Sequence, residues 1–409
     1  MASRPAESRF RIVLRNRQYR WFLASANVAN TGYAVYAISI VWLAYGVSHN
    51  FLIVGAVLFL EYAAYTCTFL FAPLVDRVAN QRTIFLASYP VQAVAAGVLG
   101  WGVWDHFLSA PLLFAVVAGL AILWDMTWAA MNAAPGVLLS PDEQFAASGV
   151  SGTIGGALSI LGFVTGGALI VFVGAAGGMF LYAGLLLLAT ALSLPMRIHP
   201  PRSSEASFGE SFREGWRLVI GGTGRPLLQL AVVDAINGFL TAAPPILVTL
   251  IAAVAYHGAP AAYGVLFTSE VVGGVVAGLA LGQWNPRRHV GVLLPIALLA
   301  TGGAVALAVA VPSDLVLGGL AWFTVGFVSA VYVDAKYAFY RGAVAPERIA
   351  RLVSNMYLFS GTAAAIGALV LSGIANGGSI VLLGLPIAAA FGAAGALGWA
   401  LPGVRRMAY

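Results

Sequence analysis

The sequence predicts an all-α polytopic membrane protein with twelve transmembrane helices, arranged as two six-helix bundles related by pseudo-symmetry. Composition indicates the class, because 60% of the residues are hydrophobic, 9% are charged and the mean hydropathy is +0.90. Ordinary water-soluble domains lie far from these values. The placement of Lys and Arg predicts the topology, and an internal repeat predicts the two bundles.

Twelve apolar stretches reach the roughly 20 residues that a helix needs to cross a bilayer. Spans 1 to 6 are expected near 21–47, 51–75, 83–104, 111–134, 146–173 and 177–196, and spans 7 to 12 near 226–254, 260–283, 290–311, 314–338, 347–374 and 379–402. The resulting domains are an Arg-rich N-terminus (1–20), an N-terminal bundle (21–196), a linker (197–225), a C-terminal bundle (226–402) and a tail (403–409).

All 21 basic residues precede span 1, follow span 12 or lie in alternate gaps between spans, including the span ends that border those gaps. Since positive charge is retained on the cytoplasmic side during insertion, both termini are expected in the cytoplasm and the protein in the inner or plasma membrane. The net charge of +6 therefore reflects the inside loops and does not indicate nucleic-acid binding. The one cysteine, Cys67, lies in span 2 and excludes an intrachain disulfide. We expect no cleaved signal peptide, because only Trp21-Phe22-Leu23 precedes the nearest small-residue site.

The linker contains an apolar stripe at helical spacing, formed by Phe208, Phe212, Trp216 and Val219. Charged residues lie between these positions in the sequence and fall on the opposite face of the helix. The pattern predicts an amphipathic helix that lies along the cytoplasmic surface of the membrane, and a regulatory partner site is the alternative.

Three features repeat at nearly the same offset and predict two related halves. Arg82 and Arg288 are 206 residues apart, Pro141 and Pro346 are 205 apart, and the pair Asn27 and Asn30 matches Asp234 and Asn237 at 207. Parallel repeats of this kind are typical of transporters whose substrate site lies between the halves near the membrane midplane.

The segment from Ala72 to Arg82 resembles the loop between spans 2 and 3 of the major facilitator superfamily, although Ala72 replaces its leading Gly. The resemblance implies the major facilitator fold, with alternating access by rocking of the two bundles. It also implies that the residues of this loop and of its repeat control the switch between access states. The expected gating residues are Asp76, Arg77, Arg82, Gly278, Arg287 and Arg288.

The segments 211–217, 224–228 and 261–266 are similar to the twelve-span, proton-driven exporter branch of that superfamily, which includes macrolide effluxers and the enterobactin exporter. Span 5 resembles the glycine motif of antiporters, in which glycines bend the helix and let it pack tightly. The matching residues are Gly149, Gly162, Gly166 and Gly167, whereas Phe163 replaces the proline of the motif.

Four carboxylates are expected inside spans, at Glu61, Asp125, Asp234 and Glu270. An ionised carboxylate in hydrocarbon is costly, and the membrane-depth segments offer no Lys or Arg to neutralise these four. We therefore expect them to be protonated or to hold a cation, as a proton-coupled exporter of cationic compounds requires. A fifth, Asp334, is expected to form a local ion pair with Lys336 near the cytoplasmic end of span 10.

Asp234 is the first candidate among the four carboxylates. It lies one helical turn from Asn237, at the level of Asn27 and Asn30 in the repeat, so both pairs are expected to face the central cavity. The alternative is a hydrogen-bonded cluster between spans. Tyr33 and Trp124 are candidates for an aromatic wall of the cavity that receives a bulky or cationic substrate.

The expected function is secondary active transport, most simply proton-coupled export of amphipathic or cationic small molecules of the drug or siderophore type. The alternatives are a facilitator or importer of a small solute, a divalent-metal transporter that uses the Asp234 and Asn27 groups as oxygen ligands, or a lipid transporter. No nucleotide-binding loop, Cys/His cluster or hydrolase motif is visible, so no enzymatic activity, cofactor or bound metal is expected. The expected coupling ion is a proton, the partners are a small molecule and the bilayer, and the chain is expected to be a monomer.

Overall fold

In the computed structural model, every regular element of the described residues is a helix. The described residues are 15–67, 75, 78–199, 213, 216–221, 226–283, 290–344 and 346–405. Within them, eleven candidate spans are long and apolar enough to cross a membrane, and the shorter apolar helix Phe51–Thr66 accounts for one more predicted span. The prediction of an all-helical, multi-pass membrane protein is confirmed.

The helices follow the predicted spans closely. Spans 1 to 6 correspond to α2 (Arg17–Ser48), α3 (Phe51–Thr66), α5 (Arg82–Trp104), α6 (Ala110–Leu138), α7 (Pro141–Phe172) and α8 (Ala175–Ser193). Spans 7 to 12 correspond to α10 (Pro226–Thr241) with α11 (Ala243–Val254), α12 (Pro260–Gln283), α13 (Val290–Ala310), α14 (Leu315–Ala343), α15 (Pro346–Ala375) and α16 (Ile380–Ala400), followed by the short α17 (Pro402–Arg405). Helix α7 begins earlier than predicted because Ser140 and Glu143 form a capping box at its start.

The predicted seventh span is not one continuous helix but breaks at Ala242, between α10 and α11. Pro244 and Pro245 follow this residue, and a proline has no N–H to donate to the carbonyl four residues earlier. One carbonyl that loses its helical donor is that of Thr241. The hydroxyl of Tyr62 in α3 donates to this oxygen over a long 3.5 Å.

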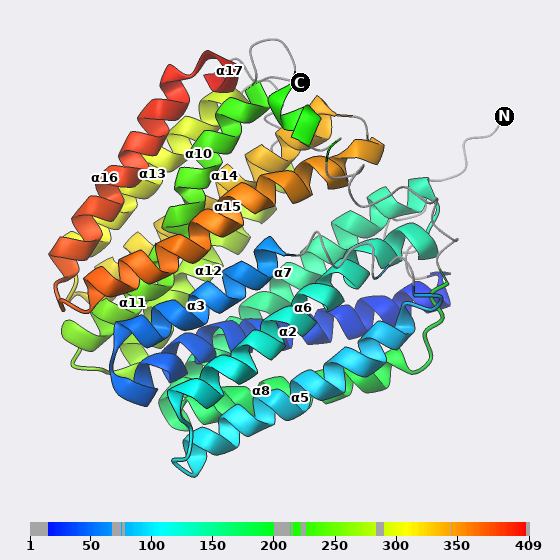
Figure 1. Ribbon diagram of the computed structural model, residues 1–409, viewed down its shortest axis with the longest axis horizontal. Helices are drawn as coiled ribbons and strands as arrows, with labels where there is room; N and C mark the ends of the chain where they lie inside the picture. Colours follow the sequence, from blue (N-terminus) through cyan, green and yellow to red (C-terminus); the bar gives the residue numbers. More distant parts are fainter. Residues whose placement is uncertain are drawn as a thin grey trace. The chain divides into compact units, whose positions relative to one another are not determined.

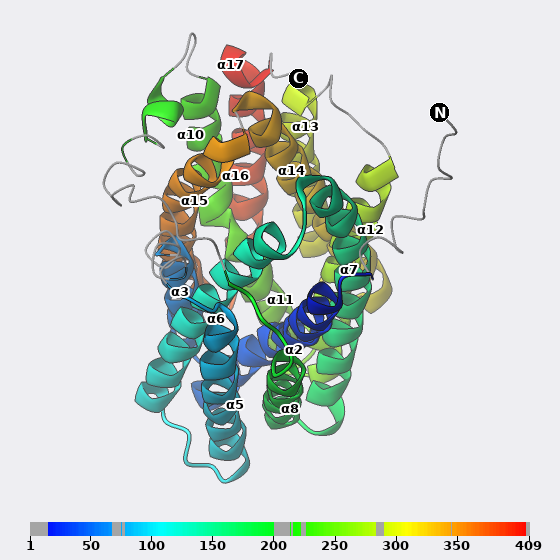
Figure 2. The same cartoon turned by 90° about the vertical axis from the view of Figure 1, so that its right-hand side faces the viewer.

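By packing, the helices divide into two compact units. The first contains Met1–Ile40, Thr68–Leu169 and Val173–Glu205, and in it α5 lies along α8 and against α6 (Figure 2). The second contains Val41–Cys67, Ile170–Phe172 and Ala206–Tyr409. In the second unit, α13 runs beside α16 and α14, α12 packs on α14, and α15 lies between α3 and α10 (Figure 1). The boundary between the two units falls inside α2, so the units describe how the helices pack. They do not test the predicted domain limits, which stay a prediction.

Glycines allow the closest helix contacts in both units. In the first unit, a Cβ at Gly162 of α7 would lie 2.6 Å from the carbonyl oxygen of Thr31 in α2. In the second, a Cβ at Gly326 of α14 would overlap the carbonyl of Glu270 in α12. Small residues at such contacts are expected in a membrane bundle, where close packing replaces the hydrophobic effect between helices.

Candidate functional site

A buried ion pair connects α10 and α14 within the second packing unit. The ammonium Nζ of Lys336 lies 2.7 Å from Oδ1 of Asp234, and the hydroxyl of Tyr332 donates to the same oxygen over 3.2 Å. The side chains of Lys336 and Asp234 are only 8% and 1% exposed. Each charge is therefore taken out of water and depends on the other for compensation.

Helical spacing explains why the two residues face each other. Asp234 belongs to the buried face of α10, together with Leu227, Leu230, Ala231 and Gly238. On α14, Lys336 follows Tyr332 by four residues, so the two side chains lie one above the other on the same face. Helix α10 packs closely against α15 and α16, and the long Lys336 side chain extends from α14 to reach its carboxylate.

The pair corrects two expectations. Asp234 was expected to have no Lys or Arg partner at its depth, but Lys336 is that partner. Lys336 was expected to pair locally with Asp334, which is wrong because residues two apart on a helix point in different directions. Asp334 instead lies beside α12, with its Oδ2 at 3.8 Å from where a Cβ of Gly278 would be.

Tyrosines surround the ion pair. The ammonium of Lys336 lies 5.6 Å from the ring centroid of Tyr332 and 5.8 Å from that of Tyr337, within the range of cation–π attraction. The ring of Tyr337 meets that of Tyr357 of α15 edge to face at 6.4 Å, and Tyr357 lies 4.7 Å from Tyr65 of α3. The site is therefore a charge pair with aromatic walls, a chemistry suited to cations and to aromatic rings.

Two other predicted carboxylates of the second unit lie near one tyrosine. The charges of Glu61 in α3 and of Glu270 in α12 both act on the hydroxyl of Tyr62. Their predicted role in proton coupling stays a prediction.

The aromatic residues predicted to line a cavity meet in the first unit. Tyr33 of α2 stacks on Trp124 of α6 with centroids 4.1 Å apart and rings 6° from parallel. Asp125, the next residue of α6, is only 5% exposed. Tyr33 and Trp124 are therefore in direct contact, while contact with a substrate stays a prediction for all three residues.

The asparagines of span 1 are placed less favourably for a substrate than expected. Asn27 is buried, and its amide nitrogen donates to the carbonyl oxygen of Leu23 in its own helix over 2.8 Å. Asn27 and Asn30 belong to the first unit, and Asp234 and Asn237 to the second. The predicted convergence of the two pairs on one cavity stays a prediction.

Most of the predicted gating residues fall on parts of the chain that are not described. Asp76, Arg77, Arg287 and Arg288 lie outside the described residues. Arg82 is the first residue of α5, and Gly278 lies on α12 beside Asp334. A gating role for this set stays a prediction.

The glycine motif of span 5 is a packing surface, at least at two of its members. A Cβ at Gly166 of α7 would lie 2.6 Å from Cγ2 of Ile38 in α2, and Gly162 is equally close to Thr31. Tight packing of this helix, which the resemblance implied, is confirmed at these positions. The contribution of Gly149 and Gly167, and any antiport, stay predictions.

The predicted amphipathic helix of the linker is partly described. Phe208 and Phe212 lie outside the described residues, whereas 216–220 are helical. Val219 is fully buried, and Trp216 stacks on Phe359 of α15 with centroids 5.4 Å apart. At Trp216, the apolar stripe therefore contacts α15 within the second packing unit.

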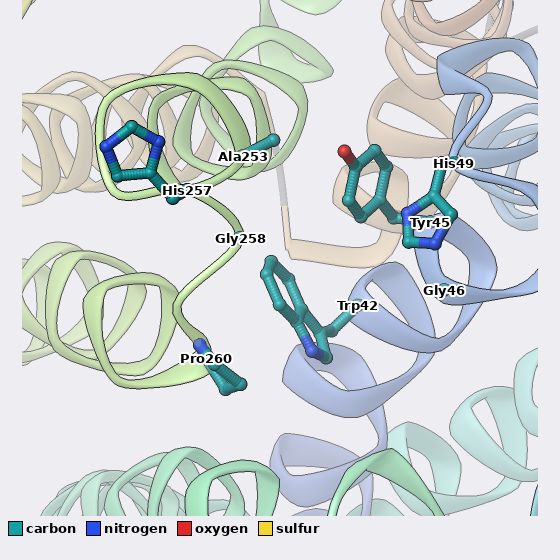
Figure 3. A pocket seen from close by; sticks show the side chains of 8 residues that line it. All are labelled: Trp42, Tyr45, Gly46, His49, Ala253, His257, Gly258 and Pro260. Atoms are coloured by element: carbon teal, nitrogen blue, oxygen red, sulfur yellow. The ribbon is translucent and has the colours of Figure 1, made fainter.

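A pocket that the sequence analysis missed opens at the ends of helices in the second unit (Figure 3). It has a volume of about 340 Å³ and is lined by Trp42, Tyr45, Gly46, His49, Ala253, His257, Gly258 and Pro260. His49 and His257 are 208 residues apart, close to the repeat offset, and both adopt left-handed backbone angles (φ 51° and 52°) where a helix ends. This equivalence is the signal that sequence reasoning had available.

Comparison with known proteins identifies the fold. No family model and no curated protein matches the chain. Among solved structures, the nucleoside transporter NupG matches with a TM-score of 0.73 at 12% identity, over 94% of this chain and 98% of that one. A POT family transporter in complex with a thioalcohol conjugated peptide matches with a TM-score of 0.70 at 11% identity, over 92% and 94%.

A third similar structure is a bacterial homolog of the human lysosomal transporter Spinster, in an inward-facing and occupied conformation. It matches with a TM-score of 0.70 at 14% identity, over 96% of this chain and 97% of that one. The chain therefore has the major facilitator transporter fold that its motifs resembled. Its resemblance to the exporter branch stays a prediction.

Proposed function

We propose that this chain is a secondary transporter that works by alternating access and couples substrate movement to protons at the Asp234–Lys336 pair. The fold supports the first part, because solved structures that share it are a nucleoside transporter, a POT family transporter and a homolog of the Spinster transporter. The buried ion pair carries the second part, since charged residues at membrane depth are costly and typically belong to an ion or proton pathway.

The geometry suggests how protonation acts. While Asp234 is ionised, it holds Lys336 and ties α10 to α14. A proton on the carboxylate removes its charge, so the attraction to the ammonium is lost and the two helices are no longer joined. A buried pair of this kind is a two-state element that protonation can bias.

For the substrate, we propose amphipathic or cationic small molecules that leave the cell in exchange for protons. An organic cation competes with Lys336 for Asp234, and the rings of Tyr332, Tyr337 and Tyr357 suit such a ligand. A second candidate is uptake or facilitated diffusion of a small neutral or zwitterionic solute. It is favoured by the fact that Lys336 already neutralises Asp234, so a neutral solute has no charge to displace.

The test is transport by the purified protein in vesicles that contain a pH-sensitive dye. A pH gradient is imposed, and tetraphenylphosphonium, a nucleoside, a dipeptide and an aromatic carboxylate are added in turn. We expect proton flux with the cation in the native chain, and none in Asp234→Asn. The matched control is Asp314→Asn, which makes the same chemical change at the N-cap of α14, where Asn also caps.

The outcomes separate the two candidates. Substrate movement without proton flux would contradict the antiporter and favour a facilitator. Proton flux in the same direction as a nucleoside or dipeptide would favour import. Coupled flux that survives in Asp234→Asn would exclude the Asp234–Lys336 pair as the coupling site.

A further inference from the structure

Three buried titratable residues follow one another along a single face of α14. Tyr332, Lys336 and Tyr340 are spaced four residues apart, so each side chain lies one helical turn from the next. Counting backbone and side chain together, Tyr332 and Tyr340 are 1% exposed and Lys336 is 6% exposed. Because the first two contact Asp234, Tyr340 continues the same face toward the end of α14 at Ala343. The predicted topology places this end at the cytoplasm.

Two buried oxygens at this face have no hydrogen-bond partner among the described residues. They are Oδ2 of Asp234, whose other oxygen receives Lys336 and Tyr332, and the hydroxyl of Tyr340. The Tyr340 side chain lies one helical turn beyond Lys336, whose ammonium contacts the other oxygen of Asp234. About nine in ten buried polar atoms have a partner in proteins, and a buried water with two or more polar neighbours commonly supplies it.

The other groups near Asp234 are already engaged. Tyr357 of α15 packs against Tyr65 of α3, with ring centroids 4.7 Å apart. Helix α16, which packs on α10, carries no titratable residue. On α14, Tyr332 and Lys336 already contact Oδ1. Among the described residues of this face of α14, Tyr340 thus carries the hydroxyl that can connect Oδ2 with the end of the helix.

We propose that an internal water binds between Oδ2 of Asp234 and the hydroxyl of Tyr340, and that Tyr340 passes protons between the cytoplasmic end of α14 and Asp234. The proposal rests on the proposed proton coupling at Asp234 and names its route. The Tyr340 oxygen accepts a proton from the cytoplasmic side and gives its own hydrogen to the water. The water in turn gives a proton to Oδ2. Only O–H bonds form and break, no electron is transferred, and Lys336 keeps its charge.

The test follows protonation of Asp234 directly, without a substrate. The full chain in lipid nanodiscs is subjected to a downward pH jump, and the rise of the carboxyl C=O band is recorded by time-resolved infrared spectroscopy. The part of the band that disappears in Asp234→Asn belongs to Asp234. In Tyr340→Phe we expect this band to reach its native amplitude about 100-fold more slowly, the lower range for loss of a positioned proton donor.

The matched control is Tyr89→Phe, which removes an equally buried hydroxyl from α5, a helix of the first packing unit that carries no residue of the Asp234 site. It is expected to keep the native rate. A native rate in Tyr340→Phe would overturn the route while leaving proton coupling at Asp234 intact. If no band depends on Asp234 at any pH, the proposed coupling fails, and the route fails with it.

A second measurement tests the water in the native chain, independently of how well the variants fold. A weakly hydrogen-bonded water gives an O–H band that shifts in H₂¹⁸O, and we expect its difference signal to accompany protonation of Asp234. Absence of any isotope-sensitive band during the jump would overturn the water-mediated step. Loss of the band in both Asp234→Asn and Tyr340→Phe would place the water between them.

Discussion

Asn376, just after α15, binds Asn50, just before α3, through side chain and backbone together. The Asn376 amide nitrogen donates to Oδ1 of Asn50 over 2.9 Å, and Oδ1 of Asn376 accepts from the backbone N–H of Phe51, also over 2.9 Å. Oδ1 of Asn50 additionally caps α3 by accepting from Leu52 N–H. The end of α15 is thereby fixed to the start of α3. By the predicted domain limits, α3 belongs to the N-terminal half and α15 to the C-terminal half, so the contact joins elements that the proposed alternating access would separate.

Removing this contact should weaken the closed arrangement of the two helix ends. Asn376→Ala deletes two hydrogen bonds, each worth about 1 kcal/mol, so an open form should gain population about tenfold or more. The measurement is the distance distribution between spin labels at Ser48→Cys and Gly377→Cys in a Cys67→Ser background. Asn132→Ala is the control, because the Asn132 amide nitrogen donates to the carbonyl oxygen of Trp128 in its own helix and, among the described residues, makes no bond to another helix. An unchanged distribution in Asn376→Ala would show that the asparagine contact does not hold the ends together.

Close packing of α3 on α15 should also be sensitive to volume at Gly55. A Cβ there would overlap the Ser372 side chain and lie 2.6 Å from the carbonyl oxygen of Ala368. We expect Gly55→Val to destabilise the protein by about 1–3 kcal/mol, the usual cost of overpacking. Gly373→Ala is the control on the same pair of helices, since its nearest neighbour would be Leu52 Cδ2 at a comfortable 3.8 Å. Thermal unfolding in detergent measures the stability of both variants. Equal unfolding midpoints for Gly55→Val and Gly373→Ala would contradict the packing argument.

The Asp234–Lys336 pair should be costly to break on one side only. Lys336→Met leaves a buried carboxylate without its cation, and such a change typically destabilises by about 3–5 kcal/mol. The double variant Asp234→Asn with Lys336→Met removes both charges and should recover most of that loss. Unfolding in mixed micelles, analysed as a double-mutant cycle, measures the coupling. Additive effects of the two substitutions would mean that the charges do not stabilise each other.

The start of α7 should respond to acid through Glu143. The backbone N–H and the hydroxyl of Ser140 both donate to its Oε2 over 2.9 Å, and these bonds, the backbone one first, hold the pKa of Glu143 below its usual value. A lowered folded-state pKa means that the capping contribution is complete above the unfolded pKa of about 4.3. It is lost as the pH falls through the folded value.

Hydrogen exchange in the first turn of α7 measures this effect. Protection should fall on acidification below about pH 4.3 in the native chain. Glu143→Gln keeps a capping side chain but cannot titrate, so its protection should not depend on pH in that range. Equal pH dependence in both proteins would exclude Glu143 as the titrating group.

The spans were predictable because their signal is local. A run of about 20 apolar residues must form a helix in a bilayer, since no water can satisfy its backbone, and the helices α5, α8, α12, α13 and α16 begin and end within a few residues of the predicted limits. The break at Ala242 was equally local, because Pro244 and Pro245 are in the sequence. A hydropathy average does not reveal this break, because two prolines within a long apolar run leave the mean hydropathy high.

The candidate site was predictable only in part. Asp234 could be selected from the sequence, because a carboxylate within an apolar run is rare and costly. Its partner could not, since Lys336 lies 102 residues away and near the end of a span, where a lysine is typical of the positive inside. The direct contact between Tyr33 and Trp124 could not be predicted either, since only the packing of α2 on α6 brings their ring centroids to 4.1 Å.

The sequence by itself determined the membrane class, the number of spans and the list of residues that are costly in a bilayer. These properties depend on the solvation of each segment, which composition and order settle without reference to other segments. The tertiary structure decided which costly residues compensate one another: Asp234 with Lys336, and Asn50 with Asn376. Such pairing depends on which helix faces meet, and that follows from the packing of all the helices together.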